Sequence, residues 1–305
     1  MRNKLLTVGI PTYNRPEEIQ QTVRKLLPQI TDEVIIRIRD NCSPVPVSTL
    51  FSQEELTKIV VVRNKVNIGG DANIAGVLYD CDTPWCWDLG DDDEVAPDAI
   101  QTILDTIKKH SDSVFIKFNC KYDLTTIGIE DFVQKFKERG MYGNILFIST
   151  SIFNVNYLKD SLCFYYKYLS TMNGQVVMLL KHLENMPKSK ITFSSRDIIL
   201  KGNDPQWVSG DFIMPLPLTL YALRSERKLL GSTLFKSMIS ACLFNCLFFC
   251  KSKKEQWYLL MYLVKNFGIY KIFICNYVII ARKILSVFLP YNIYTKLVGY
   301  IKKRI

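Results

Sequence analysis

The 305-residue sequence contains only two histidines, His110 and His182. Its nine cysteines form no C-x-x-C pair, and the near pairs lack companion histidines, which argues against a zinc site. The first residues contain no secretory h-region, so we expect a reduced, cytoplasmic setting. No internal repeat and no low-complexity linker interrupts the chain.

Long uninterrupted apolar segments are also absent. Hydrophobic residues make up 48% of the chain and charged residues 22%, which is enough apolar material for a globular core. From residue 229 onward apolar and aromatic residues dominate, yet the longest uncharged stretch, Ser237–Cys250, has only 14 residues. Because a bilayer-spanning helix needs roughly 18–20 residues, this stretch is not predicted to cross a membrane.

The net charge of +10 is unevenly distributed. Residues 224–305 hold 15 Lys/Arg and 2 Glu, a net charge of +13, whereas residues 1–223 carry a net charge of −3. Apolar helices edged with lysines are typical of segments in the membrane interface, where an anionic surface attracts each basic residue by about 1 kcal/mol. The alternatives are a helical subdomain packed on the core, with solvated lysines, and a nucleic-acid surface, for which the segment is too apolar.

We therefore divide the chain into an α/β domain at 1–223 and a basic, apolar helical region at 224–305 that associates with a membrane. Strand and helix patterns alternate through the first 120 residues of the α/β domain. Apolar residues at helical spacing predict helices after Pro16, before Tyr79 and after Pro97. The predicted strands are Leu5–Ile10, Val34–Ile38, Ile59–Val62, Trp85–Leu89 and Ser113–Phe118. This alternation predicts a largely parallel sheet with helices on both faces.

Beyond residue 120 the pattern is less regular. Phe132 and Phe136 indicate a short amphipathic helix. The run Ile145–Phe153 indicates a strand, and a further helix is predicted over about Gly174–Leu183.

Polar or glycine-rich segments follow four of the predicted strands, at residues 11–16, 40–44, 63–73 and 90–94. In parallel sheets ligands bind outside the carboxyl ends of the strands. Each segment alone could be an ordinary loop, but four of them at one edge predict a binding site.

The acidic segment Asp91-Asp92-Asp93-Glu94 is the most informative of the four, because it follows an apolar strand and includes no basic residue. Adjacent carboxylates repel one another, whereas Mg²⁺ or Mn²⁺ takes oxygen ligands and bridges carboxylates to substrate phosphates. A solvated turn before a helix is the alternative, since Pro97 suits a first helical position and acidic residues suit a helix N-terminus.

Four segments, Val8–Pro16, Asp40–Ser43, Asn67–Gly70 and Leu89–Pro97, occur in this order within residues 4–120. Together they resemble the GT-A glycosyltransferases of family 2. The resemblance implies a Rossmann-like GT-A domain that transfers a sugar from a nucleoside-diphosphate donor with inversion at the anomeric carbon. It also implies a divalent cation, Mg²⁺ or Mn²⁺, that stabilises the charge of the leaving pyrophosphate.

The resemblance also implies roles for individual residues. The implied nucleotide-binding residues are Pro11, Thr12, Tyr13, Asn14, Arg15, Asp40, Asn67, Gly70, Asn73 and Asp91. Asp91, Asp92 and Asp93 are the implied catalytic acids, with Asp92 and Asp93 as metal ligands and Asp91 nearer the ribose.

Several of these residues have plain structural alternatives. Tyr13 could pack on the sheet as a strand-end aromatic residue. Asp40 could close an Asx turn, and the segment 67–73 could be an ordinary connection between a strand and a helix.

The chain departs from the family pattern at two places. If Pro97 sets the register, Gly90 stands where an aspartate is usual. The family's general base lies just before a later helix, and the matching stretch Ser170–Gln175 has no carboxylate. An acceptor hydroxyl still has to lose its proton, and the remaining candidates for the base are Asp204, Asp211, Glu184 and His182. His182, on a predicted helix, is also compatible with a packed or solvated histidine.

The basic helical region suits an acceptor held in a bilayer, such as a polyprenyl-linked oligosaccharide. We therefore expect a bacterial-type enzyme of surface-polysaccharide (O-antigen type) synthesis, peripheral to the inner face of the cytoplasmic membrane. Its expected partners are a nucleotide-sugar donor, a saccharide or polyprenyl-linked acceptor and anionic lipid, with no nucleic acid. The alternatives are a sugar nucleotidyltransferase, whose glycine-rich loop with nearby Arg and Lys is absent, and a catalytically degenerate membrane-associated protein that binds sugar nucleotides.

Overall fold

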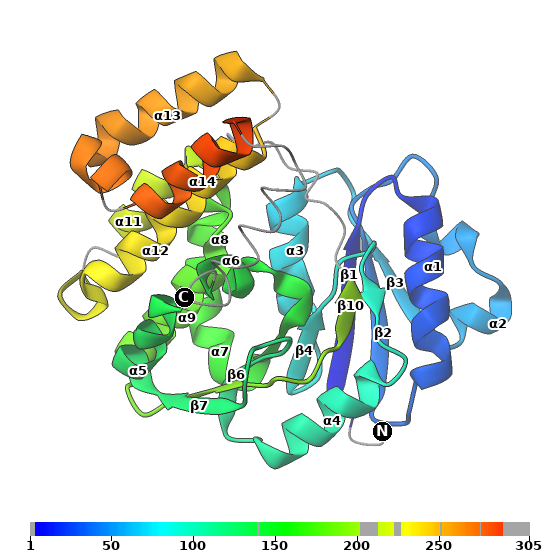
Figure 1. Ribbon diagram of the computed structural model, residues 1–305. Helices are drawn as coiled ribbons and strands as arrows, with labels where there is room; N and C mark the ends of the chain where they lie inside the picture. The colour runs from blue at the N-terminus through cyan, green and yellow to red at the C-terminus, as the bar shows by residue number, and fades with distance from the viewer. Residues whose placement is uncertain are drawn as a thin grey trace. The chain divides into compact units, whose positions relative to one another are not determined.

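The computed structural model describes residues 4–138, 141–201, 213–222, 227–250, 252–274 and 276–288. The chain forms two compact units, one of residues 1–135 with 143–205 and the other of residues 136–142 with 206–305. The described part of the first unit contains the β-sheets, and that of the second is helical (Figure 1). The domain boundary placed at residue 223 stays a prediction.

One eight-stranded sheet organises the first unit. Its strands are β1 (Leu6–Thr12), β2 (Val34–Asp40), β3 (Ile59–Arg63), β4 (Trp85–Asp88), β6 (Ser113–Lys117), β7 (Leu124–Ile127), β8 (Ser151–Asn154) and β9 (Lys190–Phe193). They lie in the order β3-β2-β1-β4-β8-β6-β9-β7. The first four strands are parallel, as are β6 and β9, whereas β8 is antiparallel to both neighbours and β7 to β9. The predicted mostly parallel α/β sheet is therefore confirmed.

Helices cover both faces of this sheet (Figure 1). In the first unit they are α1 (Pro16–Leu26), α2 (Gln53–Leu56), α3 (Gly70–Tyr79), α4 (Ala99–Lys109), α5 (Gly128–Gln134), α7 (Val155–Leu158), α8 (Leu162–Lys167) and α9 (Gly174–Asn185). The second unit contains α11 (Leu216–Ala222), α12 (Arg227–Phe248), α13 (Lys253–Phe267) and α14 (Tyr277–Phe288), and α6 (Met141–Leu146) includes residues of both units.

The main hydrophobic core lies between the sheet and helices α1 and α4. Alternate residues of β1 and β4, among them Val8, Ile10 and Trp87, are fully buried in one apolar cluster with Ile19 of α1 and Ile103 of α4. Alternation along a strand sends every second residue to the same face. The intervening residues of β1 and β4 therefore face α3 on the other side of the sheet, where Sγ of Cys86 donates to the carbonyl of Val77 at 3.9 Å.

One strand prediction was wrong in its extent. The run Ile145–Phe153 is helical through Leu146 and forms a 3₁₀ turn at Ile148–Thr150, so that only Ser151–Asn154 pairs as β8. A short apolar run does not distinguish a buried strand from a buried helix. The helices predicted near Phe132 and over Gly174–Leu183 are present as α5 and α9.

A second, two-stranded sheet pairs β5 (Glu94–Val95) antiparallel with β10 (Ile199–Lys201). Asn119 holds the returning strand, since its Oδ1 accepts a hydrogen bond from Ile198 N at 3.0 Å and its Nδ2 donates to the carbonyl of Ile199 at 2.6 Å. This pair, which the sequence did not predict, lays residues 198–201 directly beside the acidic segment.

The second unit is built around α12, against which both α13 and α14 pack. The rings of Phe244 and Phe248 stack at 4.7 Å on α12, and Lys283 of α14 lies 5.2 Å from the centre of the Phe248 ring. Among the described residues no helix combines the length and the apolar character needed to cross a bilayer. The membrane association of residues 224–305 stays a prediction.

Gly9 on β1 leaves space for α3, because a Cβ at this position would stand 2.2 Å from Cγ1 of Val77. We expect Gly9→Ala to lower the free energy of unfolding by about 1–3 kcal/mol, the usual cost of overpacking a core. Urea denaturation measures this loss. If the clash with Val77 is the cause, Gly9→Ala should lower the free energy of unfolding by less in a Val77→Ala protein than in the wild type. An equal loss in the two proteins would contradict the clash.

Candidate functional site

The carboxyl ends of β3, β2, β1 and β4 meet at one edge of the sheet, because these four strands are adjacent and parallel. Strand order reverses at β1, which has β2 on one side and β4 on the other, and α/β sheets bind ligands at such a point. The ends of these strands and the segments that follow them carry every residue that the sequence analysis assigned to nucleotide or metal. The structure therefore brings these residues to one edge, whereas their individual roles stay predictions.

Asp91 is anchored to the segment that follows β1. Its Oδ2 accepts a hydrogen bond from Thr12 Oγ1 at 2.6 Å, and its Oδ1 accepts one from Arg15 Nη1 at 2.9 Å. The carbonyl of Asp91 also accepts a hydrogen bond from Thr22 of α1 at 2.8 Å. Burial raises the pKa of Asp91, although Thr12 and Arg15 act in the opposite direction. Both carboxylate oxygens are thus engaged by protein groups, and the acidic segment is fixed in place.

Arg15 joins two carboxylates. The same Nη1 donates to Asp92 Oδ2 at 2.8 Å. Burial would lower the pKa of Arg15, but the negative charges of Asp91 and Asp92 outweigh this effect and hold its pKa above the ordinary value. The side chain of Asp92 is 19% exposed and that of Asp91 only 8%. Asp92 is therefore the more accessible of the two carboxylates.

Gly90 provides the space that Asp93 occupies. A Cβ at position 90 would stand 2.7 Å from Asp93 Oδ2 and 3.2 Å from Ser149 Oγ. Ser149 holds the turn, since its Oγ accepts from Gly90 N at 2.9 Å and its carbonyl accepts from Trp87 Nε1 at 2.7 Å. A side chain at position 90 would therefore require the carboxylate of Asp93 to shift.

Asp92 and Asp93 offer the oxygen ligands that Mg²⁺ and Mn²⁺ require. Within the part of the chain that the structure describes, no three His, Cys, Asp or Glu side chains converge into a ready ligand set. Mg²⁺ is commonly held by one or two carboxylates, with water and substrate phosphates in the remaining positions. Two neighbouring carboxylates therefore fit a cation that arrives with a diphosphate.

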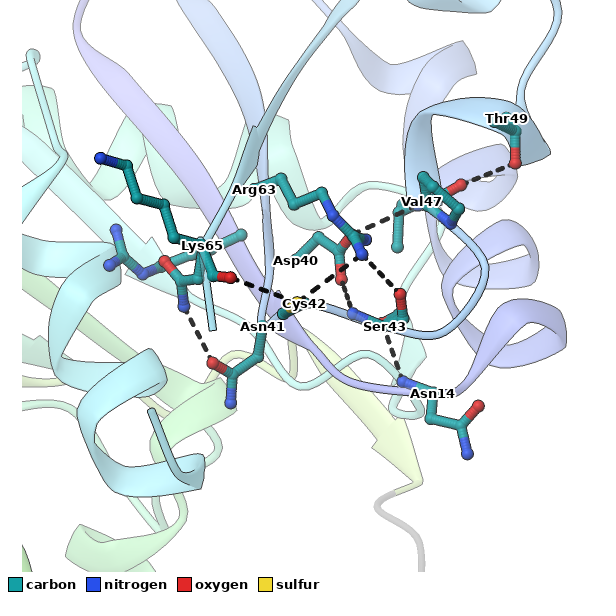
Figure 2. Close-up of polar contacts among 12 residues, drawn as sticks. Asn14, Asp40, Asn41, Cys42, Ser43, Val47, Thr49, Arg63 and Lys65 are labelled. Atoms are coloured by element: carbon teal, nitrogen blue, oxygen red, sulfur yellow. Dashed lines mark hydrogen bonds and ion pairs between the residues drawn. The ribbon is translucent and has the colours of Figure 1, made fainter. Parts of the chain in front are cut away.

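Asp40, the last residue of β2, is fully buried and closes the turn that follows it (Figure 2). Its Oδ1 accepts from Ser43 N at 2.8 Å, and its Oδ2 accepts from Val47 N at 3.4 Å and from the guanidinium of Arg63. Burial alone would raise the pKa of Asp40, but the hydrogen bonds from Ser43 and Arg63 outweigh it, so this pKa lies below the ordinary value. The carboxylate makes the turn contacts of the structural alternative, and its contact with a base stays a prediction.

Two residues near Asp40 adopt left-handed backbone without being glycine, Asn14 with φ 54° and Cys42 with φ 64°. The backbone N–H of Asn14 donates to Ser43 Oγ at 2.9 Å, which ties the segment after β1 to the segment after β2 (Figure 2). Strained backbone of this kind persists only where surrounding contacts enforce it, and it is concentrated at functional sites.

A network of asparagine side chains connects the ends of β2 and β3 with α3. Asn64 Nδ2 donates to Asn41 and to Asn73, each at 2.9 Å, and Asn41 Nδ2 donates to Asn67 at 2.8 Å. Asn73 in turn donates to the carbonyl of Arg39 at 3.1 Å. The sequence analysis gave no role to Asn41 or Asn64, although Asn41 lies in the segment Asp40–Ser43 and both residues lie in polar segments that follow predicted strands.

Tyr13, Asn14, Asn67 and Gly70 are the exposed members of the predicted nucleotide-binding residues. Tyr13 is 44% exposed, which argues against the alternative of an aromatic residue packed on the sheet. A Cβ at Gly70 would meet nothing within 4 Å. Pro11 is half-buried at the end of β1.

The stretch expected to hold the general base lies at the start of α9, where Asn173 is the N-terminal cap residue. The Asn173 side chain donates to the carbonyl of Thr171, and Met172 between them is left-handed with φ 52°. Residues 170–175 thus form a tight turn into the helix and bring no carboxylate to it.

The other candidates for the base are engaged elsewhere or lie outside the described residues. His182 has its ring nitrogens 3.3 Å from Ser161 Oγ and 3.0 Å from Ser189 Oγ, and burial lowers its pKa. Glu184 forms an ion pair with Lys181 at 3.3 Å. Asp204 and Asp211 lie outside the described residues. The contacts of the His182 ring with Ser161 and Ser189 give it the features of a packed histidine.

Asp88, the last residue of β4, is a buried carboxyl that the sequence analysis missed. It is fully buried, and among the described residues neither of its oxygens has a hydrogen-bond partner. Burial raises its pKa well above the ordinary value. Tyr165 of α8 lies against Gly174 at the start of α9, and after burial the charges of Asp88 and Asp71 also raise its pKa. Asp88 is therefore a buried carboxyl with a raised pKa, close enough to Tyr165 to affect the pKa of its hydroxyl.

We expect Asp88→Asn to increase the free energy of unfolding at neutral pH, because the folded state raises the pKa of this carboxyl. Burial costs nothing below the unfolded-state pKa of about 4, and the cost grows as the pH rises from there toward the folded-state pKa. The expected gain is about 1 kcal/mol or more at pH 7, falling to zero near pH 4. Urea denaturation of both proteins across this range measures it.

Asp112→Asn is the matched control, since Lys190 lowers the pKa of Asp112 through a hydrogen bond and so predicts the opposite trend with pH. An Asp88→Asn protein that is less stable than the wild type at pH 7 would contradict the raised pKa of Asp88.

Comparison with known proteins gives matches to a family model, to curated proteins and to solved structures. Residues 7–153 match the family model described as Glycosyl transferase family 2. Abequosyltransferase RfbV of Salmonella typhimurium is 30% identical over 110 residues, which cover 33% of this chain and 33% of that protein. The match thus spans about a third of the relative's length.

Two solved structures resemble the chain over most of its length. TarS of S. aureus superposes with a TM-score of 0.59 at 16% identity and covers 90% of both chains. The mannosyltransferase PcManGT of Pyrobaculum calidifontis, solved with GDP-Man and Mn²⁺, superposes with a TM-score of 0.53 at 11% identity over 98% of this chain and 85% of its own. At these identities the likeness shows the fold, an α/β GT-A fold with a mostly parallel sheet.

Proposed function

We propose that the protein moves a sugar from a nucleoside-diphosphate donor to a saccharide acceptor, and the match of residues 7–153 to the model of glycosyl transferase family 2 supports this. The observation that carries the proposal is the joining of Asp91 and Asp92 to Arg15 and Thr12 at the carboxyl edge of the sheet. Carboxylates for a cation and a guanidinium for phosphate are the groups that a diphosphate leaving group needs. TarS has been solved with UDP-GlcNAc, which supports a donor of this class.

In the proposed mechanism Arg15 and the acidic segment share the diphosphate. Asp92 and Asp93 would hold Mg²⁺ or Mn²⁺, and the bound cation would stabilise the negative charge that develops on the leaving nucleoside diphosphate. Arg15 already lies 2.8 Å from Asp92, so its guanidinium is placed to bind a phosphate oxygen beside that carboxylate. The acceptor hydroxyl attacks the anomeric carbon opposite the leaving nucleoside diphosphate, and this attack inverts the configuration. The hydroxyl gives its proton to a base.

We further propose that the acceptor is linked to a lipid and that the protein extends a surface polysaccharide at the inner face of the cytoplasmic membrane. The support is the composition of residues 224–305, with 15 Lys/Arg and 2 Glu among many apolar residues. The likeness to an abequosyltransferase points to the same class of saccharide-building enzymes.

One observation favours a second candidate function, a protein that binds a nucleotide sugar without turnover. Residues 170–175, where the family places its base, provide no carboxylate, and the side chain of Asn173 is bound to its own turn. Donor binding would remain in such a protein and transfer would be absent.

A thermal-shift screen of UDP, GDP, dTDP and CDP tests donor binding. We expect one nucleotide to raise the Tm only when Mn²⁺ is present, by the equivalent of about 2.7 kcal/mol at a concentration of roughly 100 Kd. In Asp92→Asn the rise in Tm with nucleotide and Mn²⁺ should be lost. The control Asp82→Asn, at an exposed carboxylate paired with Arg37, should keep it. A shift that needs no metal, or that survives in Asp92→Asn, would count against the metal assignment.

The lipid-linked acceptor is tested by comparing one saccharide in two forms, free in solution and attached to a polyprenyl diphosphate in vesicles. With the intact protein we expect kcat/KM to be at least about tenfold higher for the attached form, because a surface-bound enzyme meets a bilayer acceptor at a raised effective concentration. Equal values for the two forms would refute the lipid-linked acceptor while leaving glycosyl transfer in place.

A further inference from the structure

The second unit carries large apolar side chains on the surface of its described helices. In α13 they are Trp257, Tyr258 and Met261, which are 65%, 57% and 45% exposed. Ile269 and Tyr270, both 66% exposed, follow directly after this helix. A helix on the surface of a soluble domain normally turns polar residues to water, and a contiguous exposed apolar patch marks an interaction site.

Lysines lie among these apolar residues. Lys253, Lys254 and Lys265 are all exposed on α13. At 3.6 residues per turn, Lys254 and Lys265 fall on the same side of the helix as Trp257 and Met261. We call the six residues the α13 face, and its members are Lys253, Lys254, Trp257, Tyr258, Met261 and Lys265.

The opposite side of α13 already has a partner. Leu259 and Leu263 are 1% and 0% exposed, and the helix packs on α12. The α13 face is therefore a second apolar surface of the same helix, and packing within the described part of the unit does not account for it.

The charge of the α13 face selects its occupant. No acidic residue of α13 is exposed, because Glu255 is half-buried at the N-terminal end of the helix. A second copy docked about a two-fold axis would bring the same face, with its three lysines and no exposed acidic residue of α13, against this one. Trp and Tyr favour the headgroup level of a bilayer, and lysines extend their ammonium groups toward lipid phosphates from the same depth.

We propose that the α13 face binds the surface of an anionic phospholipid bilayer. Trp257, Tyr258 and Met261 enter the headgroup layer, and the three lysines contact lipid phosphates. The inference rests on the proposed lipid-linked acceptor, because binding to the bilayer would hold the enzyme where such an acceptor is embedded. Its test needs neither donor nor acceptor, so it can fail or succeed independently of glycosyl transfer.

The test is co-sedimentation of the intact protein with vesicles of phosphatidylcholine and phosphatidylglycerol, compared with pure phosphatidylcholine. Each basic residue near an anionic surface contributes about a fivefold factor in binding. Replacing Lys253, Lys254 and Lys265 by Gln should therefore weaken binding to the anionic vesicles roughly 100-fold. The matched control replaces Lys58, Lys108 and Lys190 by Gln, which removes the same charge from exposed lysines of the first unit.

The apolar contribution has its own variant and control. Trp257→Gln with Met261→Gln should weaken binding at least about tenfold, because burying each side chain in an apolar environment is favourable. Met186→Gln, at a residue that is 57% exposed on the first unit, should leave binding unchanged. Quenching of tryptophan fluorescence by brominated lipid provides a readout on the unmodified face when it is measured in a Trp207→Phe background. Adding Trp257→Phe should remove the quenching, since the two remaining tryptophans, Trp85 and Trp87, are buried in β4.

Three results would overturn the proposal. The first is equal binding by the two lysine variants, and the second is equal binding of the wild type to anionic and neutral vesicles. The third is self-association, seen by light scattering without lipid and abolished by Trp257→Gln with Met261→Gln, which would make the α13 face an interface between copies.

Discussion

The ion pair that Arg15 forms with both Asp91 and Asp92 is the contact on which the rest of the site depends. Asp91 and Asp92 lie 76 and 77 residues after Arg15 in the sequence, so this one guanidinium joins the segments that follow β1 and β4. Successive carboxylates repel one another, and a buried carboxylate that loses its partner costs about 3–5 kcal/mol. Arg15, with Thr12, allows Asp91 to be buried beneath the more exposed Asp92. The acidic segment can therefore present Asp92 at the edge of the sheet without unfolding the turn.

The remaining loops at this edge are fixed by polar side chains that bind one another and the backbone. Asp40 and Arg63 close the turn after β2, and the amides of Asn41, Asn64 and Asn73 join that turn to α3. A site whose loops are bound to one another before the ligand arrives loses less conformational entropy on binding. The residues buried in these contacts form a frame, and the accessible ones, Tyr13, Gly70 and Asp92 among them, are left to meet a ligand.

Sequence reasoning succeeded where a local pattern determines the structure. The five strands of the first 120 residues and the edge at which their loops meet followed from apolar runs punctuated by polar turns. Contacts set by long-range pairing were beyond it. Nothing local to Asp88 indicates that the end of β4 would bury an unpaired carboxyl, and nothing in Ile199–Lys201 predicts pairing with Glu94–Val95.

The extent of the strand predicted at Ile145–Phe153 was wrong, since an apolar run permits helix and strand alike. Gly90 departs from the family pattern, and the sequence did not indicate that the carboxylate of Asp93 would lie next to it.

The central claim, that the acidic segment holds a cation together with a nucleoside diphosphate, is tested most directly by anomalous diffraction from crystals grown with Mn²⁺ and the best-binding nucleotide. The account predicts a manganese peak within coordination distance of a carboxylate oxygen of Asp92, about 2.0–2.2 Å for a cation of this class, with diphosphate oxygens and Arg15 beside it. A nucleotide bound at the edge with manganese elsewhere, or with Asp92 still held only by Arg15, would contradict the account.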